Sequence, residues 1–172
     1  MATHLPADYY AMAQACGDAL ARAGFGMVYG GANKGLMGVA ADAALAAGGR
    51  VTGVVPMNVP ALVPHMHTGL TELVKAADMS ERKKVMYERG DAFVALPGGY
   101  GTLEEVFEIL DWRKIGLHHK QLYFLNHQGF WNPMMSMLAH FITMRTMNPE
   151  HLNYFTFVQT VDELMSFLRP AT

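Results

Sequence analysis

The sequence predicts one α/β domain built on a parallel sheet with helices on both faces. Short apolar runs alternate with segments of helical period along the chain, as in sheets whose parallel strands are joined by helices. Glycine or proline follows several of the apolar runs and ends them. A chain of 172 residues without an internal repeat or a linker fits a single domain spanning residues 1–172.

Six apolar runs have the length of buried strands. Gly30 follows the first run, Pro56 ends the second and Pro97 ends the fourth. The predicted strands are residues 25–29, 51–55, 70–75, 92–96, 121–125 and 155–158.

Six further segments have the spacing of helices. Gly24 and Gly90 are expected to stop the first and third of them, and Ser80 is the expected N-cap of the third. Thr160 and Glu163 have the spacing of a capping box at the start of the last. The predicted helices are residues 8–23, 36–47, 80–89, 102–115, 131–144 and 160–168.

The composition excludes several classes of partner. A net charge of −2 argues against a nucleic-acid or membrane surface, because such partners select clustered positive charge. No apolar run is long enough to span a bilayer, and the N-terminus lacks the pattern of a secretory signal. Cys16 is the single cysteine and is expected to be a buried small residue, which suits a reducing compartment. The sequence therefore predicts a cytoplasmic protein.

Two glycine-rich turns connect predicted strands to predicted helices. They are Gly30–Gly38 and Pro97–Thr102, and neither matches a Walker motif or the usual dinucleotide fingerprint. Glycine allows backbone N–H groups to approach an anion, and the helix N-terminus behind adds partial positive charge. Ligands of parallel sheets lie at the carboxyl ends of the strands, so the two turns favour phosphate binding over packing alone.

Glu105 has two interpretations. With Thr102 it satisfies the spacing of a capping box, which is a structural role. The helical period also places Glu105 on the side of Ile109, away from a solvated acidic stripe that includes Glu104 and Glu108. A sheltered carboxylate near a glycine turn is a candidate functional group, and both interpretations stay open.

Three cations, Arg82, Lys83 and Lys84, lie near the start of a predicted helix. The helix dipole disfavours positive charge there by a few tenths of a kcal/mol each, roughly. One explanation is an exposed basic face that tolerates this cost. The other is a nearby anion, either a phosphate or a carboxylate.

Three segments also resemble a known family. Gly30–Gly38, Asp78–Lys83 and Pro97–Glu105 resemble the Lonely Guy family of cytokinin-activating phosphoribohydrolases, often labelled lysine decarboxylase-like. The similarity runs from about Pro6 to Pro133. The pattern Pro-Gly-Gly-x-Gly-Thr-x-x-Glu is a specific signature of this family.

The resemblance implies a Rossmann-like homodimer that cleaves a purine nucleoside 5′-monophosphate, either AMP or a cytokinin nucleotide, to free base and ribose 5-phosphate. Arg82 and Glu105 match the family's catalytic pair in their spacing. Glu105 would stabilise an oxocarbenium-like transition state or orient water, and Arg82 would bind the ribosyl group with Lys83 beside it. The implied phosphate-binding and other substrate-binding positions are Gly31, Gly98, Gly99, Tyr100, Gly101, Thr102, Leu103 and Glu104. No metal or organic cofactor is implied.

The sequence departs from the family pattern in three places. The family begins with a central strand ending in a Cys-Gly-Ser-Ser-type turn, and the chain is expected to lack this strand. Pro64 stands where the family has a glutamate that contacts the base, and Asp111 stands where plant members have threonine. These two substitutions affect the expected base specificity more than the reaction.

Other functions remain as alternatives. A non-catalytic carrier of a nucleotide or phosphorylated cofactor needs the glycine turns but not the Arg82–Glu105 pair. Amino-acid decarboxylation requires a Schiff-base lysine, and the sequence singles none out.

A metal site is not expected from the histidines. His65 and His67, like the pair at 118–119, have no third ligand at a recognisable spacing, so they are interpreted as solvated loop residues. The resemblance implies a structural role for His118 near the subunit interface. Trp112 and Trp131 are expected to make packing or dimer contacts rather than stack on a base.

Overall fold

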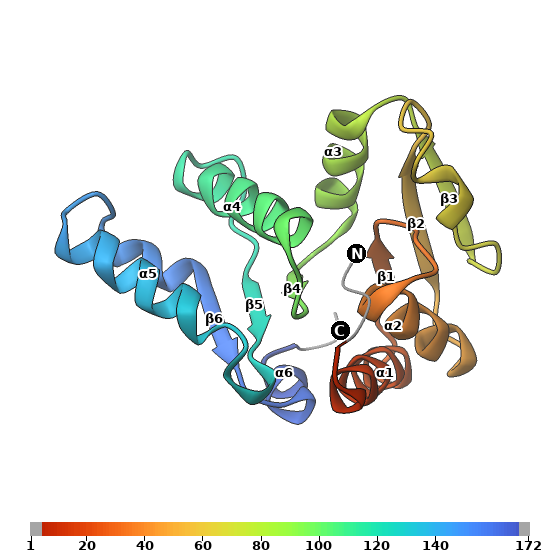
Figure 1. Ribbon diagram of the computed structural model, residues 1–172, viewed down its shortest axis with the longest axis horizontal. Helices are drawn as coiled ribbons and strands as arrows, with labels where there is room; N and C mark the ends of the chain where they lie inside the picture. Colours follow the sequence, from red (N-terminus) through yellow and green to blue (C-terminus); the bar gives the residue numbers. More distant parts are fainter. Residues whose placement is uncertain (1–4, 169–172) are drawn as a thin grey trace. The chain divides into compact units, whose positions relative to one another are not determined.

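The structure, a computed structural model, describes residues 5–168 (Figure 1). Its contacts divide the described chain into two compact units. The first extends to Gly90 and also includes the described residues from Met165 onward, and the second is Asp91–Leu164. Each unit contains three parallel strands with helices packed on them, which confirms the predicted α/β class.

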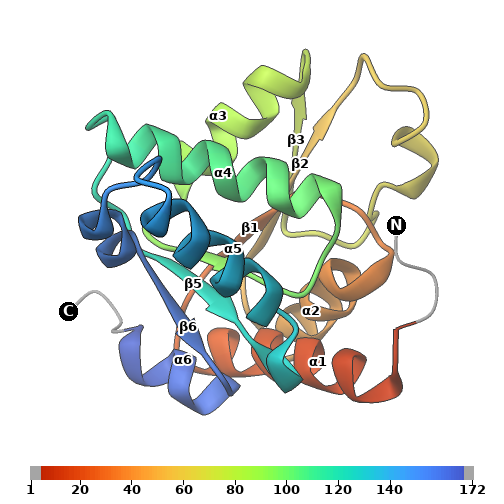
Figure 2. The same cartoon turned by 60° about the vertical axis from the view of Figure 1, so that its left-hand side comes forward.

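The first unit is a parallel sheet in the order β1-β2-β3. α2 packs against β1 and β2, α3 packs against all three strands, and α1 lies along α2 on the side away from α3 (Figures 1 and 2). Its elements are α1 (Ala7–Arg22), β1 (Met27–Tyr29), α2 (Gly35–Ala46), β2 (Val51–Pro56), the 3₁₀ helix η1 (Val63–His65), β3 (Glu72–Ala76) and α3 (Met79–Arg89).

Small residues bring α1 and α2 close together. Ala13, Ala40 and Ala41 are buried between these helices and the sheet, and a Cβ added to Gly17 would lie 2.0 Å from the Ala40 carbonyl oxygen. Cys16 is buried in the same region, and burial raises the pKa of its thiol to about 12. The thiol therefore stays protonated, as expected for a packing residue.

The second unit is a parallel sheet in the order β4-β5-β6. α4 and α5 cover one face of this sheet (Figure 2). Its elements are β4 (Phe93–Ala95), α4 (Tyr100–Lys114), β5 (Leu122–Leu125), η2 (His127–Gly129), α5 (Asn132–Thr143), η3 (Pro149–Tyr154), β6 (Phe155–Val158) and the first part of α6 (Val161–Phe167).

Aromatic side chains fill the core of the second unit. Phe124 of β5 is fully buried and meets Trp131 and Phe155 edge to face, at centroid distances of 5.3 and 5.7 Å. Trp131 is 3% exposed, so its predicted packing role is confirmed. The apolar run before it, Leu122–Leu125, is buried along its whole length, as expected for a central parallel strand.

The cap of α3 differs from the predicted one, and that of α6 agrees with it. Asp78, not Ser80, caps α3, and its carboxylate accepts a hydrogen bond of 2.8 Å from the Glu81 N–H. The Glu81 carboxylate accepts in turn from the N–H of Ala77, the residue before the cap, so Asp78 and Glu81 form a variant of the capping box. In α6 the predicted cap is confirmed, because Thr160 Oγ1 accepts from the Glu163 N–H at 3.1 Å.

Among residues 5–168, β1 and β3 are the outer strands of the first sheet, and β4 and β6 are those of the second. Each pairs with one neighbour, β2 or β5. The expectation that the chain lacks the family's first strand stays a prediction. No helix in the described part of the chain is long and apolar enough to cross a membrane.

His118 connects the end of α4 to the start of β5. Its Nε2 lies 2.9 Å from the Ile109 carbonyl oxygen, and its Nδ1 accepts a 3.2 Å hydrogen bond from the Lys120 N–H. A neutral imidazole with its proton on Nε2 satisfies both bonds. Burial lowers the pKa of His118, and the nearby Arg113 and Lys120 lower it further, against the opposing effect of the Ile109 carbonyl.

His118 is expected to make the protein less stable at mildly acidic pH. Its pKa is lower in the folded chain than in the unfolded one, so the unfolded chain binds the proton first as the pH falls. Its contribution to stability is complete above pH 6.5 and is lost as the pH falls through the lowered pKa. Denaturant midpoints between pH 5 and 8 measure this loss of stability, and His118→Asn is expected to reduce the pH dependence of the midpoint. The same change at exposed His119 is the control, and an equal reduction there would contradict the assignment.

Candidate functional site

α3 carries Arg82 to the carboxyl end of the first sheet. The capping box fixes the start of this helix, and Arg82 follows one residue after Glu81. The Arg82 Nε–H donates a 3.2 Å hydrogen bond to the carbonyl oxygen of Val54 in β2. The half-buried guanidinium is therefore held beside the glycine turn that follows β1.

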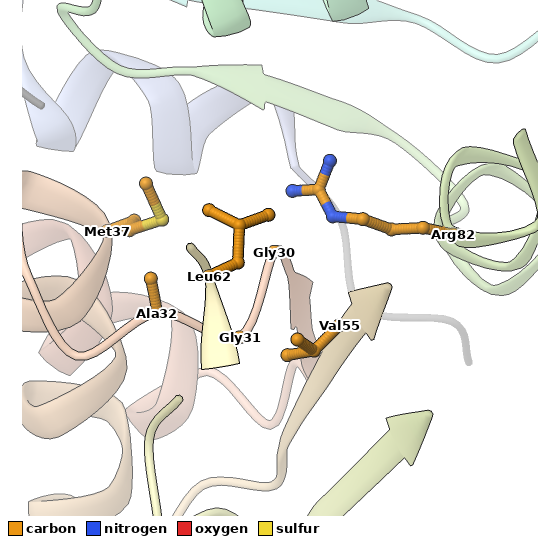
Figure 3. A pocket seen from close by; sticks show the side chains of 7 residues that line it. All are labelled: Gly30, Gly31, Ala32, Met37, Val55, Leu62 and Arg82. Atoms are coloured by element: carbon orange, nitrogen blue, oxygen red, sulfur yellow. The ribbon is translucent and has the colours of Figure 1, made fainter. Parts of the chain in front are cut away.

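A small pocket lies in front of this guanidinium. Its volume is about 100 Å³, and the side chains around it are apolar except for that of Arg82. Figure 3 shows Arg82 reaching toward Gly30, with Leu62 and Met37 beyond its head group. The lining residues are Gly30, Gly31, Ala32, Met37, Val55, Leu62 and Arg82.

Gly31 is a backbone requirement of this pocket. Its φ of 73° is in the left-handed region, and a Cβ there would lie 2.5 Å from Val55 Cγ2. A larger residue would therefore be strained and would fill the pocket. Lys83, the next residue after Arg82, is half-buried and is not among the residues that line this pocket.

The segment that carries Leu62 is fastened to the glycine turn. The Asn33 N–H donates to the His65 carbonyl oxygen at 2.9 Å. The His67 backbone N–H donates to the Gly31 carbonyl oxygen at 2.8 Å. An antiparallel bridge joins Ala32 to Met66 between these bonds. The loop thus forms one wall of the pocket.

His67 differs from the solvated loop histidine that was predicted. Its side chain is only 11% exposed, and Nε2 lies 2.8 Å from Asp42 Oδ1 on α2. Nδ1 accepts a 3.0 Å hydrogen bond from the Gly69 N–H, so the neutral ring carries its proton on Nε2. The contact with Asp42 fastens the loop to α2. Residues 5–168 contain no group of three histidine, cysteine or acidic side chains that could hold a metal ion.

The helix α4, which follows the second glycine turn, begins two residues earlier than predicted. The helix starts at Tyr100, its N-cap is Gly99, and no side chain caps it. Thr102 therefore lies inside the first turn, so the predicted capping box of Thr102 with Glu105 is wrong. A Cβ on Gly98 would lie 2.1 Å from Thr102 Oγ1, so glycine at this position leaves room for the threonine hydroxyl.

The start of α4 has the features of an anion site. The N–H groups of Tyr100, Gly101 and Thr102 have no carbonyl partner within the helix, whereas Leu103 donates to the Gly99 carbonyl at 3.0 Å. A Cβ on Gly99 or Gly101 would meet nothing within 4 Å, so the space around them is open. The helix dipole adds partial positive charge at the same place.

Glu105 follows on the same helix. It is half-buried beside buried Val106, while its neighbour Glu104 is exposed. The expected contrast between the two carboxylates is therefore confirmed. Glu108, which was expected in the solvated stripe, is half-buried. Asp111 is exposed, and its Oδ1 lies 3.3 Å from Lys114 Nζ.

Each unit gathers part of the predicted set. The first brings Gly31 and Arg82 to one pocket. The second brings together the sequence from Gly98 to Glu105 at the start of α4. The first glycine-rich turn includes Met37, and the loop around Pro60 to His67 was expected to form part of the base pocket, but the sequence did not single out Met37 or Leu62. Their places depend on the loop contacts to the glycine turn.

Comparisons with known proteins identify relatives of this chain. The family model described as "Possible lysine decarboxylase" matches residues 37–168. The cytokinin riboside 5′-monophosphate phosphoribohydrolase of Rhodococcoides fascians is 48% identical over 132 residues, which are 77% of this chain and 67% of that protein. An enzyme of the same name from Arabidopsis thaliana is 38% identical over 144 residues, which are 83% of this chain and 62% of that protein. The chain thus spans about two thirds of the length of these relatives.

Solved structures with low sequence identity share the fold. The molybdenum cofactor binding protein of Rippkaea orientalis has a TM-score of 0.72 at 18% identity, covering 95% of this chain and 88% of that one. The molybdenum cofactor carrier protein of Chlamydomonas reinhardtii has a TM-score of 0.69 at 20% identity, with the same coverage. At these identities the likeness establishes the Rossmann-like fold and no more. The family match and the sequence identities, in contrast, establish descent, and the chain belongs to the Lonely Guy family of cytokinin riboside 5′-monophosphate phosphoribohydrolases.

Proposed function

We propose that the chain hydrolyses the N-glycosidic bond of a purine nucleoside 5′-monophosphate, of the cytokinin type or AMP. The observation that carries this proposal is the start of α4, where an uncapped glycine-flanked turn is followed by half-buried Glu105. The relatives named as phosphoribohydrolases support the reaction type. The products are the free base and ribose 5-phosphate.

The 5′-phosphate is assigned to the first turn of α4. The N–H groups of Tyr100, Gly101 and Thr102 supply donors and the helix dipole supplies charge. Gly98 and Gly99 keep the approach free of side chains, and Leu103 and Glu104 complete the turn. Backbone donors of this kind bind phosphate without a metal ion.

Glu105 acts on the bond that breaks. The electron pair of the C1′–N bond leaves with the base, water supplies the hydroxyl group that bonds to C1′, and the base gains a proton. Positive charge develops on the ribosyl ring as the bond lengthens, and a nearby carboxylate stabilises it or orients the water. Arg82, with Gly31 in its pocket and Lys83 next in sequence, binds the ribosyl group.

The protein is proposed to be a cytoplasmic homodimer. α4 and the turn after it expose Phe107, Ile115 and Leu117, of which the last two are 60% and 66% exposed. Large exposed apolar side chains are suited to contact with a second copy. The charge balance and the single buried cysteine suit the cytoplasm.

Base release from AMP and from isopentenyladenosine monophosphate tests the proposed reaction. The purified chain is expected to release free base from at least one of them, and none from the matching nucleoside without phosphate. The ratio of the two rates measures the base specificity. Pro64 and Asp111, which depart from the family pattern, are expected to affect this ratio. Nucleotide binding without release of base would contradict hydrolysis and support a carrier instead.

A further inference from the structure

We propose that Gly30 is a positioning residue for Arg82, because the absence of a side chain at position 30 makes room for the guanidinium. The inference concerns the same site as the proposed function and rests on it. Its structural part can be measured without any activity.

The space beside Gly30 is filled by one group. A Cβ built on Gly30 would lie 2.1 Å from Arg82 Nη2, 3.3 Å from Cζ and 3.7 Å from Nε. All three of the nearest atoms belong to the guanidinium, and none belongs to the backbone. Glycine at position 30 thus makes room for the Arg82 side chain and not for a neighbouring segment of backbone.

A hydrogen bond holds the guanidinium in this place. The Arg82 Nε–H donates at 3.2 Å to the carbonyl oxygen of Val54, which lies on β2, the strand next to β1. The head group therefore lies over the end of β1 with one edge fastened to β2 (Figure 3). A methyl group at position 30 would lie only 2.1 Å from Nη2, so the planar group would have to shift or rotate.

The backbone at position 30 accepts alanine. Gly30 is not among the glycines with positive φ, whereas Gly31 next to it has a φ of 73°. Alanine at position 30 therefore adds no backbone strain, and the flexible arginine is the part that moves. The substitution separates the placement of Arg82 from the folding of the chain.

The first test follows the Arg82 Nε–H resonance by NMR. Gly30→Ala is expected to shift this signal and to speed its exchange with solvent, because the bond to Val54 is disturbed. Gly26→Ala is the control, since a Cβ at Gly26 has as its nearest neighbour the Arg50 carbonyl oxygen at 3.8 Å. An unchanged Arg82 signal in Gly30→Ala would overturn the proposal, whether or not the protein is a hydrolase.

The second test is kinetic. Gly30→Ala is expected to lower kcat/KM for base release on the order of 10²-fold, because a displacement of about 1 Å disrupts a positioned group. In Arg82→Lys, which keeps the charge but lacks the planar fork, the same change is expected to have little further effect. Equal losses in both backgrounds would overturn the positioning role, and so would a drop in Tm of Gly30→Ala that persists in Arg82→Lys.

Discussion

Glu105→Gln is expected to lower kcat for base release by about 10²–10⁴-fold, with little change in nucleotide affinity. The change removes the negative charge that stabilises the ribosyl cation or orients water, but keeps the size of the side chain. The phosphate donors at the start of α4 are backbone groups and are unaffected. Single-turnover kinetics and nucleotide titrations on the same variant measure the two effects separately.

Glu150→Gln is the matched control for this variant. Glu150 is an exposed residue of η3, so the same chemical change there is expected to leave kcat unchanged. Equal rates for wild type and Glu105→Gln would remove Glu105 from the reaction. A loss of affinity with unchanged kcat would assign Glu105 to binding instead of to the chemical step.

Gly17→Ala is expected to destabilise the protein by about 1–3 kcal/mol. A glycine-to-alanine change within a helix normally stabilises it by up to about 1 kcal/mol, so a loss is the opposite of the intrinsic tendency. The Cβ would lie 2.0 Å from the Ala40 carbonyl oxygen, a backbone atom that moves only if α1 and α2 separate. Denaturant unfolding gives the free-energy difference.

Gly101→Ala provides the comparison. A Cβ at Gly101 meets nothing within 4 Å, so the same substitution near the start of α4 is expected to be neutral or slightly stabilising. A gain of stability in both variants would show that α1 and α2 do not approach each other this closely at Gly17.

The elements of the fold could be predicted from the sequence to within two residues at most ends. Buried parallel strands are uniformly apolar, as Leu122–Leu125 is, and glycine or proline follows the apolar runs at 25–29, 51–55 and 92–96. Helix starts were less certain, because several residues compete for the cap. Asp78 caps α3 in place of Ser80, since its carboxylate accepts from the Glu81 N–H while the Glu81 carboxylate accepts from the Ala77 N–H.

The local parts of the candidate site could also be predicted. The turn before α4 and the sheltered position of Glu105 follow from spacing along one segment. Contacts between distant segments could not. Neither the pairing of His67 with Asp42, which are 25 residues apart, nor the bond from Arg82 to Val54, 28 residues apart, has a signal in the sequence.

The most direct test of the central claim is ³¹P NMR of the wild-type protein with isopentenyladenosine monophosphate and with AMP. Hydrolysis of the N-glycosidic bond predicts that the signal of the nucleotide is replaced by those of ribose 5-phosphate, while free base accumulates in equal amount. A nucleotide signal that only broadens or shifts as protein is added would contradict the claim and identify a carrier. Release of inorganic phosphate with the nucleoside intact would contradict it as well, because a different bond would have been broken.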